Sequence, residues 1–346
     1  MKTNNSHISS IYTLTKVEFI EKYGKVSKPF HYNCLTSWLR KGVQDFKDMS
    51  NLPESLIVAL SNDYSSPLFS KVLQESIEPD STKLLLELFD GQKIECVLLK
   101  NSDGEYTACI SSEVGCSMKC EFCATGTLGL KRQLEWTEIV EQYFHLLHLH
   151  SKIDRIVFMG MGEPLCNTNA VIKAISYFKD ELQMSPRRIT VSTSGIPKGI
   201  KMLADSKLGV KLAVSIVSAN DSIRSKLMKS NRLYPLPELK QALLYFKEHN
   251  RSRIALEYCM LHDVNTTKMG AKELKEFITD LIASVNLIPW NKIEALPFES
   301  PTHDEIQHFT KELSRLNIPY TIRISRGRDT NAACGMLALK DSKQKI

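Results

Sequence analysis

The sequence predicts an α/β protein built around a partial or full (β/α) barrel, and three observations lead to this fold class. From about residue 106 onward, apolar runs typical of strands alternate with stretches of helical periodicity. The runs are continuously apolar, as in parallel strands that are covered by helices. Seven such runs with six helical connections suit a barrel, in which the chemistry lies at the carboxyl ends of the strands.

The elements of this barrel follow from the spacing of apolar residues. The expected strands are residues 106–111, 155–160, 188–194, 210–216, 253–261, 286–290 and 319–325. The expected helices begin near Thr137 and continue with residues 168–180, 197–205, 220–228, 237–249, 271–284 and 303–316.

A different region precedes the barrel. Residues 15–75 combine short helical stretches with turn signals such as Asn51-Leu52-Pro53. Residues 83–111 carry Asp90-Gly91 and Asp103-Gly104 between apolar runs, which is typical of an antiparallel meander. We therefore expect a small helical accessory domain over residues 1–75, a β connection over 76–105, the barrel over 106–330 and a C-terminal segment over 331–346.

Composition limits the class of protein. The 346 residues are 42% hydrophobic and 24% charged, which is ordinary for a chain with a large core. No apolar run approaches the roughly 18 residues of a membrane span, and the first residues lack an apolar signal core, so we expect a cytoplasmic protein without membrane contact. The nine cysteines favour ligation or catalysis over disulfides in a reducing compartment. A net charge of +6 permits a polyanionic partner without requiring one.

Three cysteines are grouped in the stretch C-S-M-K-C-E-F-C, as Cys116, Cys120 and Cys123. A structural zinc site uses four ligands, usually in two separated pairs, and no second pair follows here. Iron–sulfur clusters also prefer four cysteines. Three thiolates therefore predict a cluster in which one iron is open to an exogenous ligand.

A glycine-containing stretch, M-G-M-G-E-P at residues 159–164, follows one of the expected strands. It lacks the third glycine of a dinucleotide-binding fingerprint, because Leu165 stands at that position. Its two glycines still allow the backbone to approach a ligand closely. Glu163 can then accept hydrogen bonds from a cationic amine.

The spacing of the three cysteines resembles that of the radical S-adenosylmethionine (SAM) superfamily, and the aromatic Phe122 before the third cysteine matches as well. This resemblance implies a partial α/β barrel and a 4Fe-4S cluster whose fourth iron binds the amino and carboxylate groups of SAM. It also implies that the stretch with Glu163 contacts the SAM amino group.

Longer stretches resemble the RlmN/Cfr family of radical SAM RNA methyltransferases, in matching order over residues 30 to 340. They are V-G-C-S-M-K-C-E-F-C-A-T-G, F-M-G-M-G-E-P-L, R-R-I-T-V-S-T-S-G, V-N-L-I-P-W-N, R-G-R-D-T-N-A-A-C-G and the N-terminal W-L-R-K-G-V-Q-D-F-K-D-M-S-N-L-P. By this resemblance, SAM contacts are expected from Gly162, Glu163, Ser192, Ser215, Ile216, Val217 and Asn291.

The resemblance also implies the reaction. Carbon 2 of adenine is electron-poor and cannot attack the SAM methyl group, whereas a thiolate can. In the family a C-terminal cysteine, matched by Cys334, takes a methyl group from one SAM, and a radical from a second SAM activates it to add to adenine. Cys109 matches the cysteine that releases the product by forming a disulfide, and Glu95 matches the carboxylate that takes the ring proton. Two SAM molecules per turnover and an electron donor such as flavodoxin are implied.

Three segments depart from the family pattern. Ser215-Ile216-Val217 lacks the family histidine at its third position, Leu261–Asn265 reads L-H-D-V-N in place of L-P-G-V-N, and Met228–Asn231 reads M-K-S-N in place of M-P-I-N. Arg326–Asp329 resembles the carbon-2 branch more than the carbon-8 branch. We therefore expect 2-methyladenosine in 23S rRNA and/or tRNA, made by a monomer.

The remaining candidates have simpler interpretations. Cys34, Cys96, Cys166 and Cys259 are expected to be structural, and His145, His148 and His150 to be helix-surface and helix-end residues. Residues available for RNA phosphates are Lys131, Arg132, Arg187, Arg188, Arg323, Arg326 and Arg328. The helical domain, with Trp38, Arg40 and Lys41, either grips RNA or caps the barrel.

Three alternatives remain open at this point. The first is carbon-8 methylation, and the second is a radical SAM enzyme acting on a protein or small molecule. The third is a protein that is not an enzyme, either an RNA-binding protein stabilised by zinc or a degenerate family member that only binds ribosomes. Metal analysis tests the zinc form, because iron and sulfide would exclude it.

Overall fold

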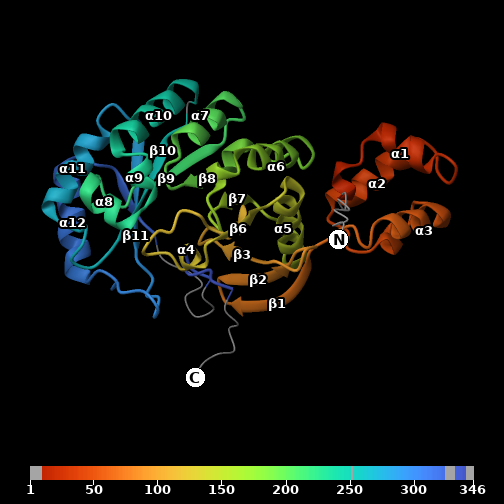
Figure 1. The fold of residues 1–346 in the computed structure, drawn as a ribbon, viewed down its shortest axis with the longest axis horizontal. Helices are drawn as coiled ribbons and strands as arrows, with labels where there is room; N and C mark the ends of the chain where they lie inside the picture. Colours follow the sequence, from red (N-terminus) through yellow and green to blue (C-terminus); the bar gives the residue numbers. More distant parts are fainter. Residues whose placement is uncertain (1–9, 251, 324–331, 340–346) are drawn as a thin grey trace, which may run out of the picture.

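The computed structural model describes residues 10–250, 252–323 and 332–339. Their main sheet has ten strands in the order β1-β2-β3-β4-β7-β8-β9-β10-β11-β12, and β5 and β6 form a separate hairpin (Figure 1). The strands are β1 (Lys71–Glu78), β2 (Ser81–Glu87), β3 (Lys93–Lys100), β4 (Tyr106–Cys109), β5 (Glu113–Gly115), β6 (Leu130–Gln133), β7 (Arg155–Phe158), β8 (Ile189–Thr193), β9 (Lys211–Ser215), β10 (Ile254–Met260), β11 (Ala283–Pro289) and β12 (Tyr320–Ile322).

Helices connect these strands and cover the outer face of the curved sheet (Figure 1). The helices are α1 (Lys16–Tyr23), α2 (His31–Arg40), α3 (Glu54–Asp63), α4 (Ala124–Leu128), α5 (Trp136–Leu149), α6 (Thr168–Asp180), α7 (Pro197–Asp205), α8 (Asp221–Leu227), α9 (Ser230–Leu233), α10 (Leu236–His249), α11 (Lys268–Ile278) and α12 (His303–Arg315).

Seven strands of the main sheet, β4 and β7 to β12, confirm the predicted α/β barrel. Every neighbouring pair among them is parallel, and their order in the sheet follows their order in the chain. Ile254, Leu256, Tyr258 and Met260 of β10 are fully buried at alternate positions, as in a strand that faces a layer of helices. Parallel strands of this kind place all their carboxyl ends at one rim of the barrel.

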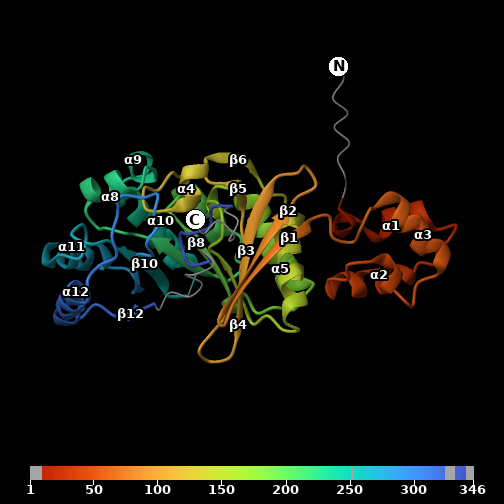
Figure 2. The same cartoon turned by 90° about the horizontal axis from the view of Figure 1, so that it is seen from below.

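The antiparallel meander is also confirmed. Strands β1 to β4 pair antiparallel and extend the sheet at its first edge, beside α5 (Figure 2). The two predicted turns hold glycines with left-handed backbone, Gly91 at φ 78° and Gly104 at φ 81°. Residues 71–75 belong to β1, so the expectation of helices up to residue 75 is wrong there. Val72 and Ile77 are exposed on this edge strand, so β1 shows no apolar pattern of a buried strand. Residues 71–78 form a strand because they pair with β2.

The helix expected over residues 271–284 is misplaced. The structure has α11 at Lys268–Ile278, where the Thr267 hydroxyl accepts a hydrogen bond from Gly270 N–H and caps the first turn. Residues 283 and 284 instead begin β11, which pairs with β10 along its whole length.

The N-terminal helices α1 to α3 lie to one side of the barrel and enclose an apolar cluster of their own, which includes Phe19, Leu35 and Leu56 (Figure 1). Arg40 of α2 forms an ion pair with Glu181 at the end of α6. This exposed contact joins α2 to the barrel.

One histidine expectation is wrong. His145 is buried on α5, where its Nε2 lies 3.0 Å from the Ser70 hydroxyl oxygen, and Ser70 also donates to Glu141. Burial lowers the pKa of His145 to about 4, so the ring is neutral near pH 7. The apolar run around it would have indicated burial. Among the described residues, no helix is long and apolar enough to cross a membrane.

A Phe144→Ala variant is expected to destabilise the fold by about 3–5 kcal/mol, because it leaves a large cavity. Phe144 is fully buried on α5, stacks on Tyr12 with ring centroids 5.5 Å apart and packs against Gly42. Urea unfolding followed by circular dichroism measures the change. Leu233→Ala, at a side chain that is 71% exposed, is the control and should shift stability by less than about 0.5 kcal/mol.

Candidate active site

The three clustered cysteines lie in the loop between β5 and α4, and all three line one cavity, here called the first cavity. Cys116 follows β5, and Cys123 immediately precedes α4. Burial raises the pKa of all three thiols above the ordinary value. Ionised thiolates at this position therefore need a cation, which fits a metal cluster.

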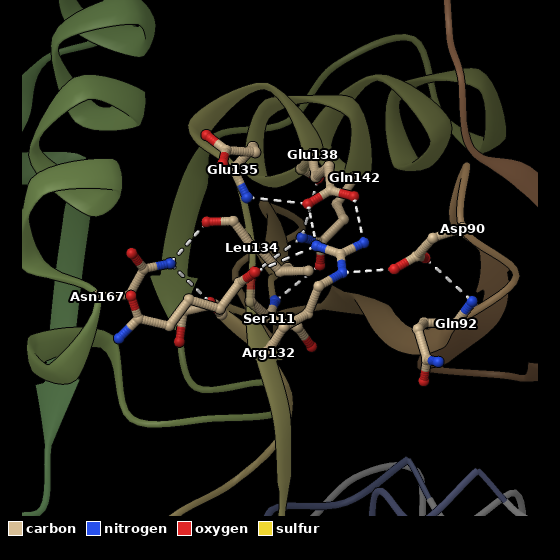
Figure 3. A network of polar contacts seen from close by, with 11 residues as sticks. Asp90, Gln92, Ser111, Arg132, Leu134, Glu135, Glu138, Gln142 and Asn167 are labelled. Carbon is tan, nitrogen blue, oxygen red and sulfur yellow. Dashed lines mark hydrogen bonds and ion pairs between the residues drawn. The ribbon is translucent and has the colours of Figure 1, made fainter. Parts of the chain in front are cut away.

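A polar network holds the two strands that flank this loop and α4, since it joins residues beside β5 and in β6 to α5 (Figure 3). Gln142 of α5 donates to Ser111 O and accepts from Ser111 N–H, just before β5. Arg132 of β6 bonds the carboxylates of Asp90 and Glu138. The expectation that Arg132 is available for RNA phosphate is therefore wrong, because two carboxylates already engage its guanidinium. Arg132 and Asp90 lie 42 positions apart in the chain, and the spacing of apolar residues in the sequence does not predict such a contact.

The glycine-containing stretch after β7 crosses the wall of the first cavity. Gly162 has φ 100°, and a Cβ placed there would lie 2.5 Å from Cβ of Glu113. Only glycine fits this position. Glu163 is buried, and its carboxylate accepts hydrogen bonds from Ser194 N–H at 2.6 Å and from Leu165 N–H at 3.0 Å. These bonds hold an acidic group beside the cysteine loop.

The ends of β8, β9 and β11 complete the first cavity with Ser192, Ser215, Val217 and Asn291. Ile216 does not line it, because its side chain is buried and its N–H donates to Glu257 O. Two buried polar atoms of the wall, Oγ of Ser194 and Oδ1 of Asn291, have no hydrogen-bond partner among the described residues. Such orphaned groups suit a polar ligand.

Val217, which replaces the family histidine, has a left-handed backbone with φ 56°. This conformation is unusual for a β-branched residue and costs roughly 1–3 kcal/mol. Asn265 holds it by donating to Val217 O at 2.7 Å. This hydrogen bond uses only the backbone carbonyl of Val217, so it can hold the left-handed conformation with either valine or histidine at this position.

Arg224 of α8 lies fully buried behind the same wall. Its guanidinium donates to the carbonyls of Ser194, Ser215 and Ile216, and to Oδ1 of Asn231. It thereby ties the ends of β8 and β9 to Asn231, the last residue of the Met228–Asn231 segment that departs from the family pattern. Asn231 therefore has a structural role.

Arg224→Met should weaken SAM binding by about tenfold or more, because several carbonyls of the cavity wall lose their donor. Equilibrium binding of SAM to the cluster-loaded protein measures this. Arg232→Met, at an exposed arginine of α9, is the matched control. Equal SAM affinity in both variants would show that Arg224 does not shape the wall.

A second cavity of about 1070 Å³ occupies the interior of the barrel and is lined by both Cys109 and Cys334. Cys334 also lines the first cavity. The segment that carries it is held by Ala124 N–H, which donates to Gly335 O, and by Thr125 Oγ1, which donates to Leu337 O. Burial raises the pKa of Cys109 to about 12. Both cysteines are free thiols here.

Basic side chains gather where the second cavity meets the amino ends of the strands. They are Arg155, Arg187, Arg188, Lys211 and Arg253. Arg155 and Arg188 form ion pairs with Glu105, whereas no ion pair of the described chain involves Arg187, Lys211 or Arg253. Arg323 also lines this cavity, and Lys131 does not. Arg326 and Arg328 lie outside the described residues.

Known proteins resemble this chain over most of its length. Residues 110–270 match the protein family described as Radical SAM superfamily. A probable dual-specificity RNA methyltransferase RlmN of Thermus thermophilus is 40% identical over 88% of either chain. One of the same description from Treponema pallidum is 40% identical over 92% of this chain and 95% of its own. The chain belongs to the RlmN family of radical SAM RNA methyltransferases.

The fold agrees with this membership. A crystal structure of a radical SAM methyltransferase from Sphaerobacter thermophilus is 35% identical, has a TM-score of 0.89 and covers 95% of this chain and 98% of its own. A radical SAM protein of the RlmN family contains a 4Fe-4S cluster and uses SAM. The first cavity fits both, since its lining includes three thiols and the orphaned polar atoms of Ser194 and Asn291.

Glu95 of β3 is the one predicted catalytic residue that lines neither of these two cavities. It is buried, not solvated as a residue on a meander would ordinarily be. Its carboxylate forms an ion pair with Lys83 Nζ at 2.8 Å and accepts from Leu339 N–H at 3.1 Å. The C-terminal segment of this RlmN-family protein therefore reaches Glu95 through Leu339, five residues after Cys334.

Sequence reasoning missed three residues of the site. Cys259, interpreted as structural, lines the first cavity, and Glu257 and Arg323 line both cavities. Glu257 had a usable signal, because it is an acidic residue inside an otherwise apolar parallel strand. Arg323 was expected only as a residue available for RNA phosphate; it lines both cavities, and the nearby Cys334 thiol is the largest influence raising its pKa.

Proposed function

We propose that this protein methylates carbon 2 of an adenine in RNA, either in 23S rRNA, in tRNA or in both, through a methylated Cys334. The observation that carries the proposal is the position of Cys334, which lines the first cavity and also the second, where Cys109 lies. A thiol that faces both spaces can accept a group from a ligand in one and deliver it to a substrate in the other.

The cofactors, when bound, supply the methyl group and the reductive cleavage of SAM that yields a 5′-deoxyadenosyl radical. Cys116, Cys120 and Cys123 hold the cluster. The SAM ligands are Gly162, Glu163, Ser192, the Ser215–Val217 segment through its backbone, and Asn291.

The remaining residues act on the substrate. Cys334 Sγ carries the methyl carbon, which bonds to adenine after losing a hydrogen atom. Glu95 takes the proton from the ring carbon while the adduct radical loses one electron, which would return to the redox cofactor. Cys109 Sγ then bonds to Cys334 Sγ as the bond between Cys334 Sγ and the methylene carbon breaks, and that carbon takes up a proton to become the methyl group of the released base. Lys83 supplies the counter-charge for the ionised Glu95 carboxylate that this role requires.

The basic mouth of the second cavity supports an RNA substrate. Arg187, Lys211 and Arg253 there can contact phosphates while one nucleotide is splayed into the barrel. Helices α1 to α3 serve as an accessory domain, the protein acts as a monomer, and a flavodoxin-like donor supplies the electron.

Nucleoside mass spectrometry tests the proposal. Cluster-loaded protein reacts anaerobically with SAM, reductant and either 23S rRNA or tRNA, beside a Cys334→Ala control. The expected product is 2-methyladenosine, formed only when Cys334 is intact. 8-Methyladenosine would assign the carbon-8 reaction, and SAM cleavage without a methylated adenine would assign a substrate other than RNA.

A further inference from the structure

Glu257 and Arg323 belong to the partition between the two cavities, since both residues line both spaces, as do Met159, Ile288 and Cys334. Glu257 lies on β10 and Arg323 directly follows β12, with β11 between them. Although their charges are opposite, no ion pair within 4.0 Å joins them among the described residues, where other buried carboxylates such as Glu95 do form such pairs. Burial raises the pKa of Glu257 and the nearby Arg323 guanidinium lowers it, but Arg323 does not bond directly to the carboxylate.

A chain of hydrogen bonds across neighbouring strands fixes the orientation of this carboxylate. Glu257, Asn286 and Thr321 stand opposite one another on β10, β11 and β12. Thr321 Oγ1 donates to Asn286 Oδ1 at 2.6 Å, so the amide nitrogen of Asn286 faces Glu257 and donates to its Oε1 at 2.9 Å. One carboxylate oxygen is thus held in place.

The other oxygen, Oε2, has no hydrogen-bond partner among the described residues, although the side chain is only 7% exposed. A buried acceptor without a donor is costly, and an ionised one more so. The site is therefore incomplete until a ligand brings an N–H or O–H group to this oxygen. In its ionised form, which the nearby Arg323 guanidinium favours, the carboxylate can accept but not donate, so it discriminates between ligands by their donors.

Adenine carries the matching group. On its Watson–Crick and major-groove edges, adenine presents an exocyclic amino group at carbon 6, whereas guanine presents a carbonyl oxygen at that position. A 6-oxo purine would place its carbonyl oxygen against Glu257 Oε2. Both oxygens are acceptors, so neither would be paired and the two would repel each other. Cys334 and Glu257 both line the second cavity, and both also line the first, so they stand where the two spaces meet.

We propose that Glu257 Oε2 accepts a hydrogen bond from the 6-amino group of the target adenine and thereby selects adenine as the base to be methylated. This assignment rests on the proposed function and adds the residue that reads the base. Glu257 is a specificity residue here, distinct from the cysteines that carry the methyl group.

The test compares two versions of whichever RNA responds in the methylation assay. One carries adenosine at the target position, and the other carries purine riboside, which lacks only the 6-amino group. With Cys334 methylated beforehand, the single-turnover rate of transfer should be about tenfold to a hundredfold lower for purine riboside, the value of a hydrogen bond to a charged acceptor. Both RNAs react with the wild-type protein, so the result does not depend on whether a protein variant folds.

Glu257→Gln provides the second arm. Asn286 will hold the carbonyl oxygen of the glutamine, so that its amide NH₂ takes the place of Oε2. The rate with adenosine should then fall by a similar factor while the rate with purine riboside changes little, and the discrimination disappears. Any intrinsic difference in reactivity between the two bases cancels in this comparison. Glu248→Gln, at an exposed position of α10, should behave as wild type.

The outcomes separate the possible errors. Equal wild-type rates on the two RNAs, or discrimination that persists in Glu257→Gln, would overturn the assignment. Loss of SAM affinity in Glu257→Gln with unchanged discrimination would assign Oε2 to SAM instead. Failure of wild-type protein to methylate even the adenosine RNA would overturn the proposed function, and with it this assignment.

Discussion

Cys109→Ala should accumulate a covalent complex between the protein and its RNA, joined through Cys334. In the proposed reaction the methylene bridge between Cys334 Sγ and adenine is broken only when a second thiol attacks Cys334 Sγ, and Cys109 is the other thiol of the second cavity. Without it, turnover should fall by about 10³-fold or more, as when a covalent nucleophile is removed. A denaturing gel of labelled RNA after anaerobic reaction would detect the complex.

Two matched variants sharpen this prediction. Cys96→Ala removes a neighbouring buried thiol on β3 that lines neither cavity, and it should leave turnover intact. The double variant Cys109→Ala with Cys334→Ala should form no complex, because the attachment point is gone. If Cys109→Ala turned over normally, the release step would have to use another group.

Replacing any one of Cys116, Cys120 and Cys123 by alanine should abolish cluster binding. Three thiolates are the fewest that hold such a cluster while leaving one iron open, and the loop offers no fourth. Iron and sulfide analysis after anaerobic reconstitution, with the visible absorption of the cluster, should show near-complete loss in each variant, and SAM cleavage should be lost with it.

Cys34→Ala is the control for this experiment, because Cys34 lies on α2 in the N-terminal cluster, away from the loop. It should retain wild-type iron and sulfide. Retention of full iron by a variant of the three loop cysteines would contradict the assignment of the ligands, and zinc in place of iron would contradict the cofactor.

The barrel could be predicted from the sequence because its signals are local. Helix α6 has the predicted bounds of 168–180, and α7 starts at Pro197, a residue that favours a first helical turn. The strands were visible as apolar runs, since parallel strands are buried on both faces. Strand β1 was missed because its exposed apolar residues follow no pattern, and only pairing with β2 makes it a strand.

The site was predicted only where residues cluster along the chain or resemble a family. The cysteine loop and the Gly162-Glu163 stretch are local and lie as expected around one cavity. The burial of Glu95 against Lys83 and the partition formed by Glu257 and Arg323 depend on how separate strands pair. No spacing rule places such residues together, because sheet pairing decides which side chains share the interior of the barrel.

The central claim is that Cys334 itself carries the methyl group to the base. Peptide mass spectrometry of protein incubated with SAM and reductant, before and after addition of the responding RNA, tests it most directly. We predict that the peptide containing Cys334 is first heavier by one methylene unit and then loses that mass as 2-methyladenosine appears. An unmodified Cys334 in protein that nevertheless methylates RNA would contradict the account.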